Sequence, residues 1–296
     1  MVSRARLCML GSLRSRTLHL AWKSALKRHG QKISLVLPVR WTLTWSRVVR
    51  LAEIGWISAQ NAPEGLRVGS TLIAGGQSRG EFAASNLAAH VGDDPLNVQA
   101  NRQTLLDQIG AKRLQWLQQV HGETLVYADD KGQPALPSAD AVWTDQRQLG
   151  LAILTADCVP VLLWRADTSI IVGIHAGWRG LSAQIIEQTV AALPVANSRW
   201  VAWIGPCISA AHYEVGQAVW SKFEGWPEQQ ILRPHPTDAQ KRNLNLAAAA
   251  FVALKRAGVD EICCSGICNY SDPRFYSFRG RRAEETGRFA SVIMRI

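Results

Sequence analysis

Acidic residues are missing from the first 52 positions of this 296-residue chain, in which Glu53 is the first acid. Eleven of the chain's 33 Lys and Arg residues lie in that stretch, and all 23 acidic residues lie beyond it. The remainder therefore has 22 basic residues against 23 acidic ones, and it is almost neutral. The net charge of +10 describes an N-terminal appendage, so it does not assign nucleic-acid binding to the rest of the chain.

We expect residues 1–52 to be a poorly packed basic extension, either disordered or translated from a start codon upstream of the true one. An Arg-rich, Ser-containing, acid-free segment is also typical of a mitochondrial targeting leader. A basic arm that contacts RNA or anionic lipid is a third interpretation. A secretory signal fits poorly, because the apolar stretches 7–13 and 33–39 are short and no A-x-A cleavage site accompanies them.

Long apolar runs, internal repeats and flexible linkers are also lacking. No stretch approaches the ~18 consecutive apolar residues of a membrane span, and no period of ~20–50 residues indicates a solenoid. No Pro/Gly/Ser-rich linker divides residues 60–296, so we expect one catalytic domain over 53–296. Short apolar strands mixed with helices predict an α/β-type domain with mixed sheets, with strands at 114–120, 149–154, 159–164, 170–174, 200–204, 275–278 and 289–296 and helices at 98–109, 180–193, 215–224 and 244–257.

Cysteine pairs with metal-finger spacing are absent. The six cysteines include no C-x-x-C pair, which excludes a structural Cys₄ zinc module. Six in 296 residues is also too sparse for a disulfide framework, so we expect a reducing compartment, the cytoplasm.

Three metal-ligating residue types stand at the ends of predicted strands, followed by turns or breaks: His121, Cys158 and His175. Two imidazoles and a thiolate are ligands that Zn²⁺ or copper accepts, and three protein ligands leave a fourth position open, as in catalytic zinc. A metal-free nucleophilic pair, with Cys158 attacking and His175 as its base, is a second hypothesis. Ordinary buried or surface roles are a third, because no two of the three share a short motif.

A candidate anion site follows His175. Gly177 and Gly180 flank Trp178-Arg179 between a predicted strand and a predicted helix, whose free N–H groups and positive end favour anions. The planar guanidinium of Arg179 suits phosphate or carboxylate. A tight turn with a solvated Arg179 is the alternative. Further residues that could line the same cleft are Ser209, His212, Tyr213, Arg279 and Arg288.

Several motifs in fixed order carry a resemblance to a known family over about residues 56–296. They are Gln119-Val120-His121-Gly122, Thr155-Ala156-Asp157-Cys158-Val159-Pro160, His175-Ala176-Gly177-Trp178-Arg179-Gly180, Ile204-Gly205-Pro206-Cys207-Ile208, Phe275-Tyr276-Ser277-Phe278-Arg279 and Thr286-Gly287-Arg288-Phe289. Together they resemble the YfiH/laccase-domain family of purine nucleoside phosphorylases, formerly described as polyphenol oxidases.

The resemblance implies a single-domain α/β (α+β) sandwich of mixed β-sheets flanked by helices. It implies a zinc centre held by His121, Cys158 and His175, with copper as a second candidate, and catalytic roles for these residues and Asn86. It also implies a phosphate contact from Arg179, beside which we expect Gly180 and Arg279. As a neighbour of Cys158, Asp157 is a candidate for proton transfer in catalysis, and support of the metal ligands or a cap of the turn is the alternative. The implied activities are phosphorolysis of adenosine, inosine, guanosine and methylthioadenosine, and deamination of adenosine. The expected partners are these nucleosides and phosphate, with no nucleic acid or membrane, for a monomer or homodimer.

Two positions depart from the family pattern. Ile73 stands in Thr71-Leu72-Ile73-Ala74-Gly75-Gly76 where the family usually has Arg, and Ala88 stands where Gly is usual. An apolar side chain cannot hold an anion, so any anion contact from position 73 is lost. We expect these changes to affect substrate affinity more than the metal site.

Alternative functions belong to other classes. A metal-free Cys-His hydrolase or amidase would use Cys158 and His175, and thiol alkylation but not chelation would inactivate it. A copper-dependent polyphenol oxidase needs several coppers and more His ligands than these motifs supply. A nucleic-acid-binding protein would depend on residues 1–50. A cell-wall precursor editing role is also associated with bacterial members of the family.

Overall fold

The computed structural model describes residues 53–131, 136–195, 199–227, 231–281 and 286–296. The basic extension predicted over 1–52 lies outside the described residues. Two large sheets and one small sheet make up the domain, which confirms the predicted α/β sandwich of mixed sheets. No helix of the described residues is long and apolar enough to cross a membrane.

The first sheet has five strands in the order β1-β2-β14-β6-β3. They span Trp56–Ser58 (β1), Leu66–Thr71 (β2), Phe289–Arg295 (β14), Leu149–Thr155 (β6) and Arg113–Gln115 (β3). The second sheet has six strands in the order β13-β9-β7-β8-β5-β4. They span Glu261–Cys264 (β13), Trp200–Ile204 (β9), Val159–Arg165 (β7), Ile171–Ala176 (β8), Ala141–Thr144 (β5) and Leu125–Tyr127 (β4).

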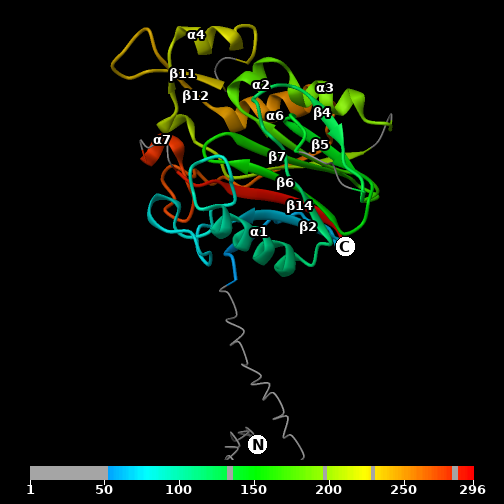
Figure 1. Ribbon diagram of the computed structural model, residues 1–296. Coiled ribbons are helices and arrows are strands. Elements are labelled where there is room, and N and C mark those ends of the chain that lie inside the picture. The colour runs from blue at the N-terminus through cyan, green and yellow to red at the C-terminus, as the bar shows by residue number, and fades with distance from the viewer. Residues whose placement is uncertain (1–52, 132–135, 196–198, 228–230, 282–285) are drawn as a thin grey trace, which may run out of the picture. The chain divides into compact units, whose positions relative to one another are not determined.

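Helices cover the outer faces of these two sheets (Figure 1). The helix α1 (Pro95–Ile109) packs Leu105 and Ile109 against β6 and β14. On the other side α3 (Ile185–Ala192) and α6 (Leu246–Arg256) pack against β7, β8 and β9. Asp94 caps α1 by accepting the backbone N–H of Leu96, and Pro95 occupies the first helical position.

Alternation along the strands explains the continuous apolar runs. Leu162 of β7 and Leu151 of β6 pack in the core between the two sheets, whereas the neighbours Leu163 and Ala152 face the helices. Because both faces of each central strand are covered, almost every residue is buried. At Gly173 a Cβ would lie 3.0 Å from Ile153, so glycine permits the close approach of the sheets.

A small third sheet has the order β10-β12-β11 and lies beside the short helix α4 (Gln217–Trp220; Figure 1). Its strands are Glu214–Val215 (β10), Arg242–Leu244 (β12) and Leu232–Pro234 (β11). The described part of the chain also has the short helices α2 (Trp178–Ser182) and α7 (Phe278–Arg281) and three 3-10 turns (Gly80–Phe82, Ala210–His212 and Ser221–Phe223).

Four predicted elements differ from the structure. The helix predicted over 215–224 is the four-residue α4 followed by the 3-10 turn Ser221–Phe223, and Val215 belongs to β10. The strand predicted over 114–120 ends at Gln115, because the side chain of Gln119 instead makes both hydrogen bonds to the backbone of Leu154. The strand predicted over 275–278 is a loop entering α7, since its polar groups bond to Asp157. The helix predicted over 180–193 is two helices, separated at Gln184, which has φ 62°.

Candidate metal centre and substrate cavity

The three candidate ligands come from three separate segments of the chain, one strand and two connections. His175 lies within β8, Cys158 lies in the turn from β6 to β7, and His121 lies in the loop between β3 and β4. Their ligand atoms all lie within 4.8 Å of one another, and His121 Nε2 is 3.9 Å from Cys158 Sγ. The structure therefore brings together residues that are 37 and 17 positions apart in the sequence.

The donor set fits a metal ion. Tetrahedral zinc with bonds of about 2.0–2.3 Å places neighbouring N and S ligands about 3.5 Å apart, close to the 3.9 Å between His121 and Cys158. The rings of His121 and His175 lie close together, with centroids 4.8 Å apart and an angle of 76° between their planes. Among the described residues this is the one group of three or more His, Cys, Asp or Glu side chains with that spacing.

Asp140 is the support of this centre that the sequence analysis missed. Its buried carboxylate accepts the backbone N–H groups of Val120, His121 and Gly122 at 3.1, 3.0 and 2.8 Å. It also lies 2.7 Å from Nδ1 of His175, which leaves Nε2 as the free ring nitrogen. A carboxylate behind a ligating histidine fixes the tautomer and raises the basicity of the ligand. One signal was in the sequence: a lone acid in Ala139-Asp140-Ala141, at the start of an apolar strand.

Charge interactions within the cluster favour its ligating state. Burial opposes ionisation of Cys158, but the nearby imidazoles of His175 and His121 outweigh it and lower the pKa of the thiol. Burial opposes protonation of His175, but Cys158 and Asp140 outweigh it and raise the pKa of the imidazole. Without a metal, one proton is shared between the thiolate and the imidazole. A metal ion that binds the thiolate and the neutral imidazole releases this proton.

A cavity of about 340 Å³ opens beside the three ligands. Aromatic rings and cationic groups dominate its remaining wall: Trp178, Tyr213, Phe278, Arg179, Arg279, Arg288 and His90. None of the three guanidinium groups forms an ion pair with a carboxylate of the described residues. Burial, with charge repulsion from Arg288 and Arg102, lowers the pKa of His90. The wall therefore offers positive charge to an anion and aromatic rings on which a planar ring compound can stack.

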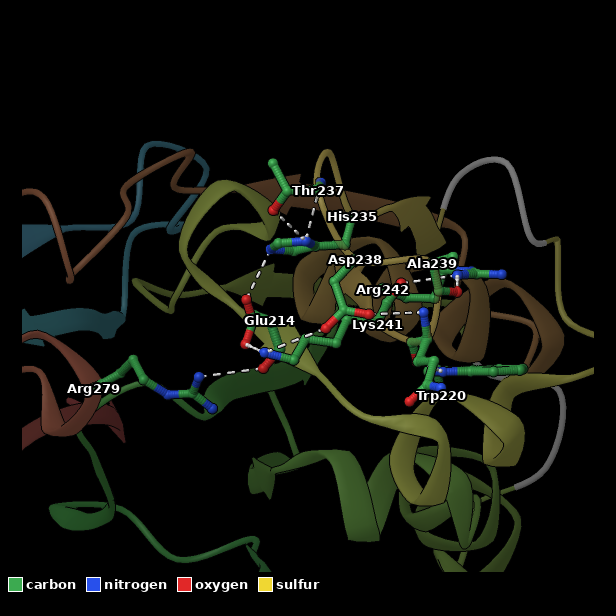
Figure 2. Close-up of polar contacts among 10 residues, drawn as sticks. Glu214, Trp220, His235, Thr237, Asp238, Ala239, Lys241, Arg242 and Arg279 are labelled. Carbon is green, nitrogen blue, oxygen red and sulfur yellow. Dashed lines mark hydrogen bonds and ion pairs between the residues drawn. The ribbon is translucent and has the colours of Figure 1, made fainter.

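The small third sheet holds one of these arginines in place. The guanidinium of Arg279 donates to the backbone carbonyl of Glu214 at 3.2 Å and lies 5.3 Å from the ring centre of Tyr213. Figure 2 shows the Glu214 side chain between His235 and Lys241, at 2.7 Å from each. Because β10 pairs with β12, the acceptor for Arg279 is a backbone carbonyl of a paired strand and not a flexible side chain.

Other candidates from the sequence take different places. Arg179 lies on the cavity wall with its guanidinium 4.5 Å from the ring of Trp178, and its helix α2 has only five residues. The predicted anion site therefore depends on side-chain charge more than on a helix end. Gly180 does not line the cavity; a Cβ there would lie 3.2 Å from the carbonyl of Gly122, so Gly180 allows α2 to pack on the His121 loop.

Asp157 and Asn86 are both buried and fully engaged with the chain. Asp157 lines the cavity, but its carboxylate accepts the side chains of Asn269 and Ser277 and the backbone N–H of Arg279. Asn86 is not on the cavity wall; it binds the backbone of Ala88, the carboxylate of Asp93 and the backbone N–H of Arg288. The contacts of both residues hold the C-terminal segments that carry the cationic wall.

Two further predicted positions lie near the cavity without lining it. Ile73 packs with the cluster of Ala156, Phe275, Tyr276 and Phe289, of which Ala156 reaches the cavity. His212 stacks on Tyr270, with ring centroids 4.2 Å apart. Of the remaining cleft candidates, Tyr213, Arg279 and Arg288 line this cavity and Ser209 lines a second one.

The fold is a four-layer α/β sandwich with a His-Cys-His cluster at one end of its sheets, and a known protein family matches this chain. The family model described as multi-copper polyphenol oxidoreductase laccase matches residues 67–296. The chain belongs to this family, and the resemblance seen in the motifs is confirmed.

Its relatives in the family carry a different functional name. The purine nucleoside phosphorylase of Pseudomonas aeruginosa is 37% identical over 234 residues, which are 78% of this chain and 94% of that protein. The purine nucleoside phosphorylase of Haemophilus influenzae is 32% identical and covers 79% of this chain and 96% of that protein. The crystal structure of YlmD from Geobacillus stearothermophilus superposes with a TM-score of 0.76 at 30% identity, covering 81% and 96% of the two chains.

Proposed function

We propose that this protein is a purine nucleoside phosphorylase that holds zinc between His121, Cys158 and His175. The names of its relatives and the cationic, aromatic cavity beside the three ligands support the proposal. In the reaction, an oxygen of phosphate forms a bond to C1′ of the ribose while the bond from C1′ to the purine nitrogen breaks. The products are ribose 1-phosphate and the free base, which takes up a proton.

The arginines on the cavity wall explain how this chain would bind phosphate. Arg179, Arg279 and Arg288 have no carboxylate partner among the described residues, so their charge is available to a dianion. The transition state resembles an oxocarbenium ion, and a phosphate held against its positive charge stabilises it. Bound zinc would supply a Lewis acid at the same end of the cavity.

The aromatic side chains provide the site for the base. Trp178, Tyr213 and Phe278 line the cavity, and Phe278 is 46% exposed, which leaves its ring available for stacking. With its pKa lowered, His90 is neutral at pH 7 and offers one donor and one acceptor to the sugar or base. We expect adenosine, inosine, guanosine and methylthioadenosine as substrates, and deamination of adenosine as a second activity.

The experiment that tests this proposal separates its reactions by their products. Incubation of the purified chain with adenosine should yield adenine and ribose 1-phosphate only when phosphate is present. Inosine formed without phosphate reports the deaminase activity separately. Adenine formed equally well without phosphate would contradict the phosphorylase and indicate a hydrolase.

The structure supports a copper oxidase less well than a phosphorylase. A reaction at several coppers needs further ligand groups, and the described residues contain one group of suitable spacing.

The described cysteines are all free, which agrees with the proposed cytoplasmic location. We expect the protein to act on these small molecules as a monomer or homodimer, with neither nucleic acid nor a membrane as a partner.

A further inference from the structure

A second cavity, of about 250 Å³, has three cysteines in its wall: Cys207, Cys264 and Cys268. Cys207 is buried, Cys268 is partly exposed and Cys264 is exposed, and none of them is in a disulfide. This cavity shares no lining residue with the substrate cavity. The three thiols therefore have no part in the reaction proposed above.

The fold of the second sheet gathers these thiols. β13 pairs in parallel with β9, so Cys264 lies opposite Ile204, at the point where β9 runs into Gly205-Pro206-Cys207. Gly266 then adopts φ 67°, which turns the chain so that Cys268 lies opposite Cys207 in an isolated parallel bridge. Residues from two separate connections thus face one hollow.

Cys268 differs from its neighbours in its surroundings. The backbone N–H of Ser209 points at its sulfur, with a nitrogen-to-sulfur distance of 3.3 Å. Burial opposes ionisation of Cys268, but the hydrogen bonds of Ser209 and Ser271 outweigh it and lower the pKa of the thiol. The sulfur of the exposed Cys264 receives no hydrogen bond from any described residue. Of the two accessible sulfur atoms, that of Cys268 is therefore the one with a described donor that stabilises a thiolate.

A cation stands on the wall of the same cavity. Arg233 of β11 is exposed, and its guanidinium forms neither a hydrogen bond nor an ion pair with any described residue. Among the described residues that line this cavity there is no acid. A ligand that carries a carboxylate would therefore be attracted to Arg233, and a cysteine of the wall would hold it through a sulfur–sulfur bond.

We propose that Cys268 is a site of covalent thiol modification, taking a small disulfide that bears carboxylates, with Arg233 as the counterion. The Cys268 thiolate attacks one sulfur of the disulfide, and a new S–S bond forms as the ligand's own S–S bond breaks. The departing half leaves as a thiolate with the electron pair and takes a proton from water. The disulfide is the oxidant, so the step needs no other co-reactant.

Glutathione disulfide is the probe for the test, on the full-length reduced protein at pH 7. Adducts are assigned by mass spectrometry of tryptic peptides, in which the fragment between Arg256 and Arg274 contains Cys263, Cys264 and Cys268. The hydrogen bond from Ser209 favours the thiolate of Cys268, and the thiolate is the form that attacks a disulfide. We therefore expect the adduct on Cys268 to form faster than that on Cys264, although Cys264 is more exposed.

Two variants and a second probe separate the cavity from simple reactivity. Arg233→Gln should slow the reaction of Cys268 with glutathione disulfide and leave its reaction with bis(2-hydroxyethyl) disulfide, which is uncharged, unchanged. Cys268→Ser should abolish the fast adduct, whereas Cys263→Ser, outside the cavity wall, should not. Faster reaction at Cys264, an internal Cys207–Cys268 disulfide in place of an adduct, or equal effects of Arg233→Gln on both probes would overturn the proposal.

Discussion

Replacing Asp140 by Asn tests the support of the metal centre with almost no change of shape. The carboxylate accepts three backbone N–H groups of the His121 loop and the Nδ1 hydrogen of His175. An amide offers one accepting oxygen, and its NH₂ group would face donors. His175 can then donate to the amide oxygen or lose its acceptor. In neither orientation does the amide keep all the hydrogen bonds to the His121 loop and to the His175 ring.

The size of the effect follows from these contacts. Changing a carboxylate that orients a ligating histidine weakens metal affinity by roughly 10–100-fold. Losing hydrogen bonds to a buried charge costs about 1.5–3 kcal/mol each, so we also expect the metal-free protein to lose stability. Of the four contacts, at least two are lost in any orientation of the amide, which suggests a decrease of about 3 kcal/mol or more in the free energy of unfolding.

Zinc competition with a chromophoric chelator measures the first effect, and urea unfolding of the chelated protein measures the second. Asp145→Asn is the matched control, because Asp145 is exposed near the end of the same strand and contacts none of the ligands. Zinc affinity of Asp140→Asn within about threefold of the unaltered protein would refute the reasoning.

Three further predictions follow from the site and the core. Arg179→Gln should raise KM for phosphate by roughly 10–100-fold with little change in KM for the nucleoside, because a charged hydrogen bond to the anion is lost; equal effects on both KM values would contradict this. Gly177→Ala should weaken zinc binding, since its Cβ would lie 3.1 Å from Cys158 Sγ, whereas Gly216→Ala, at a similar φ in open space, should not. Burial raises the pKa of Cys207, so the folded protein keeps this thiol protonated while the unfolded chain ionises above about pH 8.5. The contribution of this thiol to the free energy of unfolding is complete below that pH and falls by about 1.4 kcal/mol one pH unit above it. Measured by urea unfolding in reductant, the free energy of unfolding of Cys207→Ala should decrease less between pH 8 and pH 10 than that of the unaltered protein. Identical decreases would contradict this prediction.

The layers of the fold could be predicted from the sequence where burial alone decides the structure. β7 and β8 read as apolar runs because sheets and helices cover both their faces. The loop at 275–278 read as a strand for the same reason, since Phe275 and Tyr276 are buried. What distinguishes it is the hydrogen bonding of Ser277 to Asp157, 120 residues away, and local pattern carries no trace of such a contact.

The candidate ligands could be found from the sequence through family motifs, but their support could not. Spacing alone leaves several roles open for His121, Cys158 and His175, whereas the family motifs single them out as a set, and the structure places their ligand atoms together. Asp140 is a single acid between two alanines, and only the folded His121 loop reveals its role. The acceptor of Arg279 is a backbone carbonyl, which no side-chain pattern can show.

Zinc content and phosphorolysis, measured on the same preparations of the unaltered protein and of Cys158→Ala, test most directly whether the three ligands and the cavity form one catalytic centre. We predict about one zinc per chain and phosphate-dependent release of adenine from adenosine for the unaltered protein, and the loss of both in Cys158→Ala. A Cys158→Ala protein that lacks zinc and still releases adenine at the full rate would contradict the account.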